Sequence, residues 1–448
     1  MSRRNLFLLI ATAIVSYVCY VRGEQNPYAR YVAAGYSMID RWSLEDVPDE
    51  ELFEGAMRGM VGVLAKHGDE HSLYVNQEER NAFREDLSQE FGGVGVRIRL
   101  LGQPPQLTVI GPPEPGTPAF TADIRSGDRI LAIDGEPTQS MDLLDVLNQM
   151  RGLVGEPVLL SLLHHGETEP IEVSLTRAVI TVPSIQGDIR DKDNGWHYRL
   201  EQEPRLGYVQ ITKFGDKTVA ELSQALAELT SNGIEGLILD VRDNSGGALD
   251  AAVGISDLFL RAGLPIVTTR GRDGVTRDRF VSTGRGGYTE IPMVVLVNQD
   301  SASASEILAA CLQDYGRAAI IGQRSYGKGT VQRLLRTESG RSLLKLTSAT
   351  YWRPSGRNIH RMLGASKSDD WGVSPDSGLE VSLDEDEFLQ WRQYRRRRND
   401  IGNRPDGPLA EQIEAEDGEV PAEFVDRALE LAVDVLVERL ENQEPPNR

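Results

Sequence analysis

The sequence predicts an α/β protein of several domains, and two patterns indicate this class. From about residue 180 to 380, uninterrupted apolar strands alternate with amphipathic helices, as in a largely parallel sheet covered by helices. Before them, from about 93 to 178, short strands separated by turn signals predict a smaller β-rich domain with short helices. At roughly 100–200 residues per domain, the length fits two to four domains. We expect the following segments: 1–22, 23–92, 93–178, 179–380 and 381–448.

Composition narrows the class further. The 448 residues are 40% hydrophobic and 26% charged, which is too apolar for a disordered chain and too mixed for a polytopic membrane protein. The net charge of −20 argues against a nucleic-acid partner. Only seven of the 48 basic residues are lysines and 41 are arginines, which indicates a bias toward arginine as the generic cation. A lysine that persists against this bias is a candidate for chemistry that needs a neutral amine.

The cysteines and histidines do not indicate a disulfide framework or a metal site. Cys19 and Cys311 make no disulfide framework. His67 and His71 have a spacing that fits zinc, but they lack a matching acidic or cysteine partner, so a surface pair is the preferred interpretation. No metal or cofactor is expected.

The N-terminal segment has the residue pattern expected of an export signal. Arg3 and Arg4 precede an uncharged run over residues 5–21, and Arg22 closes it. This arrangement fits an uncleaved signal anchor, with a cleaved signal peptide and a buried helix as successively weaker alternatives. Because the basic residues flank the N-terminal side, the rest of the chain should lie outside the cytoplasm.

The segments that follow have distinct periodicities. Apolar residues recur every three or four positions within 25–90, which predicts helices. In the β-rich segment, Asp134-Gly135 after the strand 129–133 is a hairpin signal, and a short helix is expected at 141–150. Further strands are expected at 158–163 and 171–175.

The α/β segment supplies the buried strands. We expect these strands at 206–211, 236–241, 292–297 and 318–321, with helices at 218–229, 248–260 and 303–312. After residue 380 the chain becomes acidic, with 18 Asp and Glu against nine Arg. The block Arg395–Arg398 is expected to be solvated or paired within this tail, and a terminal helix is expected at 424–440.

Three segments carry chemistry. Ser303 lies where a strand meets a helix, so helix N–H groups are available for an oxyanion, although Ser303 to Glu306 is also an ordinary S-x-x-E capping box. Lys328 is the lysine of a near-match to a phosphate-binding loop, Gly322-x-x-x-x-Gly327-Lys328. Gly329 stands where that loop needs Ser or Thr, and a strand follows instead of a helix, which argues against a nucleotide site. The turn Arg242–Gly247, after a buried strand, permits close backbone approach.

Together these segments resemble the carboxyl-terminal processing peptidases, which are serine–lysine proteases with a PDZ domain. The resemblance extends from about residue 50 to 380. It rests on Glu90–Val96, Ser126–Gly135, Arg242–Gly247, Ser301–Glu306, Asp314–Ala318, Gly327–Gln332, Pro354–Ile359 and Gly372–Asp376. It implies a crotonase-like α/β protease core over 179–380, a PDZ domain over 93–178, and a place in the bacterial cell envelope on the periplasmic side.

The resemblance also implies roles for individual residues. Ser303 would be the nucleophile, Lys328 the general base and Gln332 the residue that orients it. Backbone N–H groups of Ala304 and of Gly246 or Gly247 would form the oxyanion hole. Asp314 has two equally weighted interpretations, an auxiliary site residue and a helix-terminal charge. A lysine base must be neutral, so burial would have to lower its pKa from about 10.4.

The β-rich domain would read the substrate. By resemblance, Gly93, Val94, Gly95 and Val96 would bind the carboxylate of a free C-terminus. Asp123 stands where the family has glycine, a position that tolerates Asp in a left-handed conformation. The expected partners are protein or peptide substrates with free C-termini and the membrane through residues 5–21. An adaptor or activator and a second copy of the chain are further candidates. The alternative is a catalytically silent PDZ scaffold on the same fold.

Overall fold

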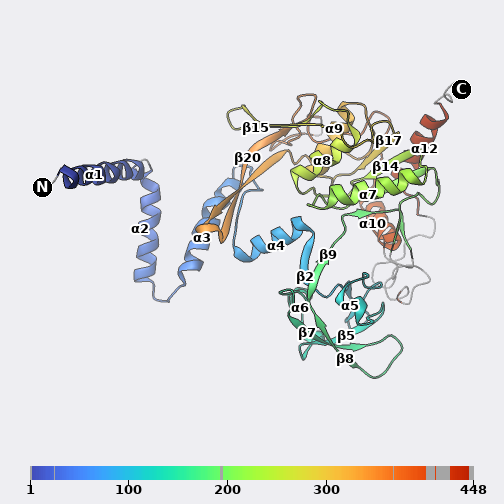
Figure 1. The fold of residues 1–448 in the computed structure, drawn as a ribbon, viewed down its shortest axis with the longest axis horizontal. Coiled ribbons are helices and arrows are strands. Elements are labelled where there is room, and N and C mark those ends of the chain that lie inside the picture. The colour runs from blue at the N-terminus through green and yellow to red at the C-terminus, as the bar shows by residue number, and fades with distance from the viewer. Residues whose placement is uncertain are drawn as a thin grey trace. The chain divides into compact units, whose positions relative to one another are not determined.

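The computed structural model describes residues 3–24, 26–191, 195–366, 368–399, 409 and 424–442 (Figure 1). The chain forms two compact units. The first contains residues 1–77 and 333–346, and the second contains residues 78–332 and 347–448.

The first unit begins with helices, as the periodicity predicts. They are α1 (Arg3–Glu24), α2 (Pro27–Trp42) and α3 (Asp49–Ala65). Strand β1 (Leu73–Val75) follows and pairs antiparallel with the first part of β20 (Ser342–Trp352). Within the residues that the structure describes, none of the helices combines the length and the apolar character that a membrane span requires.

The β-rich part of the second unit is an antiparallel sheet with the strand order β3-β4-β5-β7-β8, and β6 pairs with β5. Asp134 and Gly135 both have positive φ between β5 and β6, so the hairpin prediction is confirmed. The elements of this part are α4 (Gln77–Ser88), β2 (Glu90–Gly93), β3 (Ile98–Leu101), β4 (Gln106–Val109), α5 (Pro118–Thr121), β5 (Arg129–Ile133), β6 (Glu136–Pro137), α6 (Leu143–Met150), β7 (Pro157–Leu163), β8 (Ile171–Thr176) and β9 (Ala178–Thr181). Strands β2 and β9 pair antiparallel where the chain enters and leaves this domain.

The α/β part of the second unit is built on a five-stranded sheet. Its order is β10-β13-β14-β17-β18, and the last four strands are parallel, as predicted. These strands are β10 (Ile185–Gln186), β13 (Leu206–Ile211), β14 (Gly236–Asp240), β17 (Met293–Val297) and β18 (Ala319–Gly322). The other strands of the second unit are β11 (Ile189–Arg190), β12 (Trp196–His197), β15 (Pro265–Gly271) and β16 (Thr276–Val281). Strand β19 (Thr330–Thr337) begins in the second unit and continues into the first. Because parallel strands end at the same edge, the turns after β14 and β17 are brought together.

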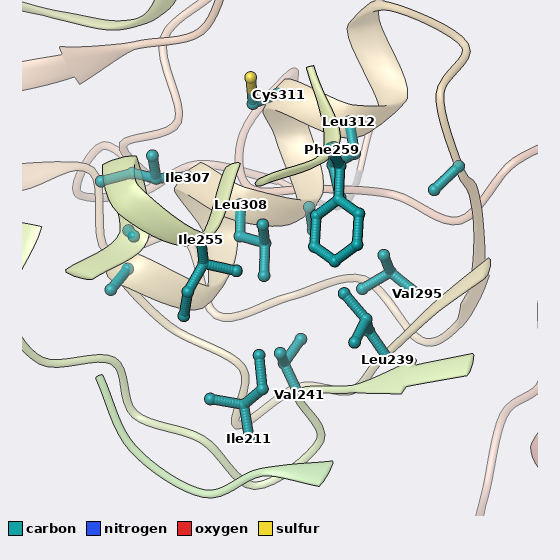
Figure 2. Packing of buried hydrophobic residues seen from close by; sticks show 14 of the residues in the cluster. Ile211, Leu239, Val241, Ile255, Phe259, Val295, Ile307, Leu308, Cys311 and Leu312 are labelled. Carbon is teal, nitrogen blue, oxygen red and sulfur yellow. The ribbon is translucent and has the colours of Figure 1, made fainter. Parts of the chain in front are cut away.

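Both faces of this sheet are covered. Leu239 and Val295 face a core built with α7 (Thr218–Ser231), α8 (Leu249–Phe259) and α9 (Ala304–Asp314). In Figure 2 the ring of Phe259 lies among these side chains, and Leu308 lies beside it. The neighbouring residue Ile238 faces the opposite core, which is completed by the C-terminal helix α12 (Arg427–Glu441).

The C-terminal segment corrects one expectation. Helix α10 (Glu385–Asn399) contains the arginine block, and Arg395 is buried. Its guanidinium donates to the backbone oxygen of Gly187 at 3.1 Å, and Arg398 forms a 2.7 Å ion pair with Asp188. The expectation of a solvated or self-paired block is therefore wrong for Arg395 and Arg398, because a buried carbonyl and a carboxylate some 200 residues earlier in the chain accept their hydrogen bonds. Arg396 is exposed. Among the described residues after 380, Val381 and the buried face of α12 belong to the core on this side of the sheet.

Candidate active site

Ser303 lies in a strained turn between β17 and α9. Its backbone has φ +56° and ψ −109°, a conformation that L residues rarely adopt, and its side chain is buried. The turn is fixed by its serine neighbours. Ser301 donates its hydroxyl to the carbonyl of Val241 at 2.7 Å, and Ser305 donates to the carbonyl of Asn244 at 2.8 Å. These bonds tie the Ser303 turn to the turn that follows β14.

The turn after β14 approaches Ser303 through a glycine. A Cβ placed on Gly246 would lie 2.9 Å from Cβ of Ser303 and 3.0 Å from the amide nitrogen of Ala304. Gly246 also has φ +101°. Asn244 supports this approach because its carbonyl accepts the N–H of Ala302 at 3.0 Å. The tertiary structure therefore brings Gly246 against Ser303 and Ala304, which lie more than 50 residues later in the sequence.

The backbone N–H groups at this junction differ in availability. Gly246 donates its N–H to Oδ1 of Asn244 at 2.8 Å, so this N–H is already used. Gly247 lies against Phe214, whose hydrogen bonds go to the neighbouring residues Gly246 and Ala248. Among the described residues, no acceptor is bonded to the N–H of Gly247 or of Ala304. Of the two glycines expected as oxyanion donors, Gly247 is therefore the one whose N–H is available, together with the N–H of Ala304 at the positive end of α9.

Replacing Gly246 with alanine is expected to lower kcat by about 10²-fold or more, because the added methyl would displace the Ser303 turn. The variant also adds backbone strain, because Gly246 has positive φ. Gly233→Ala is the matched control, since Gly233 has φ +72° but open space around its Cβ position. Both variants strain the backbone, but only Gly246→Ala should displace the Ser303 turn, so comparing their peptide-cleavage kinetics separates the two effects. Equal kcat values in Gly246→Ala and Gly233→Ala would contradict the assignment.

Lys328 lies on a loop that runs from β18 into β19. Its side chain is half-buried. The glycines on either side allow the loop to contact another segment. A Cβ on Gly327 would lie 2.7 Å from Cβ of Arg361, and one on Gly329 would lie 2.2 Å from the backbone nitrogen of His360. His360 thus lies beside the lysine loop, a proximity in space that the sequence separation conceals. The strand after Lys328 confirms that this is no phosphate-binding loop.

Glu306 joins the two loops. Its Oε2 accepts the backbone N–H of Ser303 and the backbone N–H of Lys328, each at 2.8 Å. Its Oε1 accepts the N–H of Gly327 at 2.7 Å and the hydroxyl of Ser325 at 2.6 Å. Burial raises the pKa of the Glu306 carboxyl to about 7, although these four hydrogen bonds oppose the shift. The sequence indicated this residue only as the end of a capping box, and its second function as a bridge was missed.

Two other predicted site residues have definite surroundings. Gln332, on β19, donates its amide to Thr330 at 2.9 Å and to Thr347 at 3.4 Å. Asp314 is the last residue of α9, so about 16 Å of helix separates it from Ser303.

Asp314 makes the contacts of a structural ion pair. Arg353 donates to it at 2.6 Å, and both side chains are buried. Burial alone would raise the pKa of the Asp314 carboxyl, but hydrogen bonds from Arg353 and Ser355 outweigh it and lower the pKa below its ordinary value. These contacts favour the helix-terminal interpretation of Asp314.

The predicted carboxylate-binding residues divide into two pairs. Gly93 pairs with Ala178 between β2 and β9, and Val94 packs in the core of the β-rich domain. Gly95 has φ +83°, and Gly95 and Val96 line a cavity of about 190 Å³. A second cavity, of about 610 Å³, shares three wall residues with the first and extends to Thr212 and Lys213. The shared residues are Phe91, Val182 and Pro183.

Comparison with known proteins identifies the family. A model of peptidase family S41 matches residues 205–378, and a PDZ-domain model matches residues 109–163. The carboxy-terminal-processing protease of Bartonella bacilliformis is 33% identical over 389 residues, which cover 85% of this chain and 82% of that protein. The chain belongs to the carboxy-terminal processing protease family. The carboxyl-terminal-processing protease of Synechocystis sp. is 34% identical over 321 residues, covering 72% of this chain and 70% of that protein.

A solved structure, the photosystem II D1 C-terminal processing protease, is 27% identical and covers 80% of this chain and 94% of that one, with a TM-score of 0.44. Membership of the family makes this chain a serine protease with a PDZ domain and a mixed α/β core. The predicted family, fold class and enzyme class are confirmed, and the enzyme is favoured over the silent scaffold.

Proposed function

We propose that this protease cleaves peptide bonds through an acyl-enzyme formed on Ser303, with Lys328 as the general base. The observation that carries the proposal is the shared carboxylate oxygen of Glu306, which binds the backbone N–H of both residues at 2.8 Å. One oxygen atom therefore links the turn of the nucleophile to the loop of the base. Such a link is what a two-residue catalytic site requires, because both groups must be held within hydrogen-bond reach.

The reaction would proceed in two halves. Neutral Lys328 accepts the hydroxyl proton of Ser303 as Oγ attacks the scissile carbonyl carbon. The carbonyl oxygen becomes an oxyanion, which the N–H groups of Gly247 and Ala304 stabilise. As the C–N bond breaks, protonated Lys328 gives its proton to the leaving amine, and the acyl group remains on Oγ. Water, deprotonated by Lys328, then attacks the acyl carbon; the C–Oγ bond breaks, Lys328 returns the proton to Oγ of Ser303, and the acid product leaves.

The PDZ domain would select substrates by their free C-terminal tails. The cavity at Gly95 and Val96 supports this part, because backbone N–H groups at such a loop bind carboxylates. The larger cavity supports a path for the chain of the substrate, since it extends to Lys213, directly before the Phe214 that holds Gly247.

One experiment tests both parts. Wild type and Ser303→Ala are incubated with an unstructured peptide that ends in a free carboxylate, and with the same peptide amidated at its C-terminus. Ser303→Ala should be at least about 10³-fold slower on the free peptide. Amidation should raise KM for the wild type. Undiminished cleavage by Ser303→Ala would contradict the assignment of Ser303 as nucleophile. Equal KM values for the two peptides would contradict recognition of the free C-terminus.

Export and anchoring by residues 5–21 are also part of the proposal. They are supported by the order of the residues, with Arg3 and Arg4 before an uncharged run. Cell fractionation with extraction at alkaline pH, followed by sequencing of the mature N-terminus, tests them. Recovery of the full-length chain in the cytosol would contradict export.

A further inference from the structure

The carboxylate of Glu306 is enclosed by three segments of the chain. Its own turn supplies the N–H of Ser303, and the lysine loop supplies three donors. The third segment contacts it at Gly372, where φ is +61° and an added Cβ would lie 3.3 Å from Oε1 of Glu306. The next residue, Val373, donates its N–H to the hydroxyl oxygen of Ser325 at 2.7 Å. Glu306 is therefore the centre of the junction between these segments.

An ordinary capping box does not need this arrangement. A capping glutamate at the third position of a helix binds the N–H of its own cap residue and stabilises one helix end. Here one cap bond goes to Ser303, and the other three go to a loop that begins 19 residues later. All four partners are neutral donors, so the acceptor sites of an ionised carboxylate are filled.

We propose that Glu306 is a positioning residue that sets the distance between Ser303 and Lys328. The inference rests on the proposed function, since it assumes that these two residues react together. Glutamine at this position would keep the shape but present an amide NH₂ to two donors, so at least one of the two loops would separate from the carboxyl group. A shift of about 1 Å between nucleophile and base is enough to cost about 10²-fold in rate.

The protonation state of Glu306 should then influence activity. With a pKa of about 7, the carboxyl is partly protonated below neutral pH, and a proton on either oxygen opposes one of the N–H donors. The loop facing Glu306 carries the titratable groups Lys328 and Tyr326. The guanidinium groups of Arg324 and Arg361 are also close, each 4.6 Å from the centroid of the Trp371 ring. The segment 371–373 adds no ionisable side chain.

The test compares Glu306→Gln with the wild type in steady-state kinetics from pH 5 to 9. We expect kcat to fall by about 10²-fold with KM changed by less than about threefold, because the tail-binding cavity lies elsewhere. We also expect the acidic limb of the kcat/KM profile to become shallower, because one ionisation is removed. Asp188→Asn is the matched control. Asp188 is an equally buried carboxylate that binds Arg398 and the N–H of Glu201 away from Ser303.

A purely structural function of Glu306 would give a different result. It would lower the melting temperature and the active fraction, as in Asp188→Asn, but kcat per folded molecule and the pH profile would match the wild type. That outcome would overturn the inference. If Ser303→Ala also retained activity, the proposed function would fail first, so the two failures are distinguishable.

Ser325→Ala provides a second test if Glu306→Gln does not fold. This variant removes one donor to Oε1 and leaves the bonds of Oε2 to Ser303 and Lys328 in place. Loss of a donor to the ionised form should raise the pKa of Glu306, so the acidic limb should move to higher pH. An unmoved limb would overturn the inference.

Discussion

Lys328→Arg is expected to abolish proteolysis while leaving the fold intact. Arginine keeps the positive charge, but its guanidinium stays protonated in proteins and cannot become the neutral base that the reaction needs. General-base catalysis contributes about 10²–10⁴-fold, so kcat should fall by at least about 10²-fold. Peptide cleavage measured with equal amounts of folded protein, verified by circular dichroism, gives the result.

The composition of the chain makes this substitution informative. Arginine supplies 41 of the 48 basic residues, so a position that needs only a positive charge is usually an arginine in this chain. Lys217→Arg is the matched control, because Lys217 is half-buried and paired with Glu90 outside the site. It should retain wild-type kcat. If Lys328→Arg were as active as Lys217→Arg, another group would be the base. The next candidate would be His360, whose backbone lies against Gly329.

Arg242→Met is expected to cause the largest loss of stability. Arg242 is buried between two buried carboxylates, Asp240 at 2.6 Å and Asp426 at 2.8 Å, and lies 4.5 Å from the ring of Trp391. Removing it leaves both carboxylates without their cation, which typically costs about 3–5 kcal/mol in the free energy of unfolding. Urea unfolding at pH 7 measures this cost. Arg205→Met, which breaks an exposed pair with Glu203, should leave stability nearly unchanged.

The pH dependence identifies the cause. In the wild type, burial would raise the pKa of Asp426, but pairing with Arg242 lowers it below its ordinary value. A lowered carboxyl pKa stabilises the fold above the unfolded value of about 3.9, and this contribution is lost as pH falls through the folded pKa. In Arg242→Met the cation is gone, so burial raises the pKa of Asp426. Protonation of Asp426 then removes the cost of a buried, unpaired charge. The stability deficit should therefore shrink between pH 7 and pH 5, and a constant deficit would contradict this explanation.

Local patterns predicted most of the elements around the site. The apolar runs that became β13, β14, β17 and β18 were identifiable because a strand buried on both faces needs apolar residues at every position. The hairpin at Asp134-Gly135 and the left-handed conformation of Asp123, with φ +57°, follow from local backbone chemistry. Membership of the family followed from the order of motifs along the chain.

Other features depend on contacts between distant residues. Nothing near Arg395 in the sequence indicates that Arg395 donates to the carbonyl of Gly187 or that Arg398 forms an ion pair with Asp188. The proposal of Gly247 rather than Gly246 as an oxyanion donor depends on the Asn244 side chain, which accepts the N–H of Gly246 within its own loop. Residue type and spacing do not predict which acceptor such an N–H group binds.

The sequence by itself determined the family, the parallel sheet and the residue types available for catalysis, because these follow from hydrophobic periodicity and from short ordered motifs. The tertiary structure decided how those residues meet. Ser303 and Lys328 are 25 positions apart, and only the packing of β17, β18 and α9 brings their backbones to one oxygen of Glu306. The physical reason is that a buried carboxylate must satisfy its acceptors with whatever donors the fold places around it, and those donors come from segments far apart along the chain.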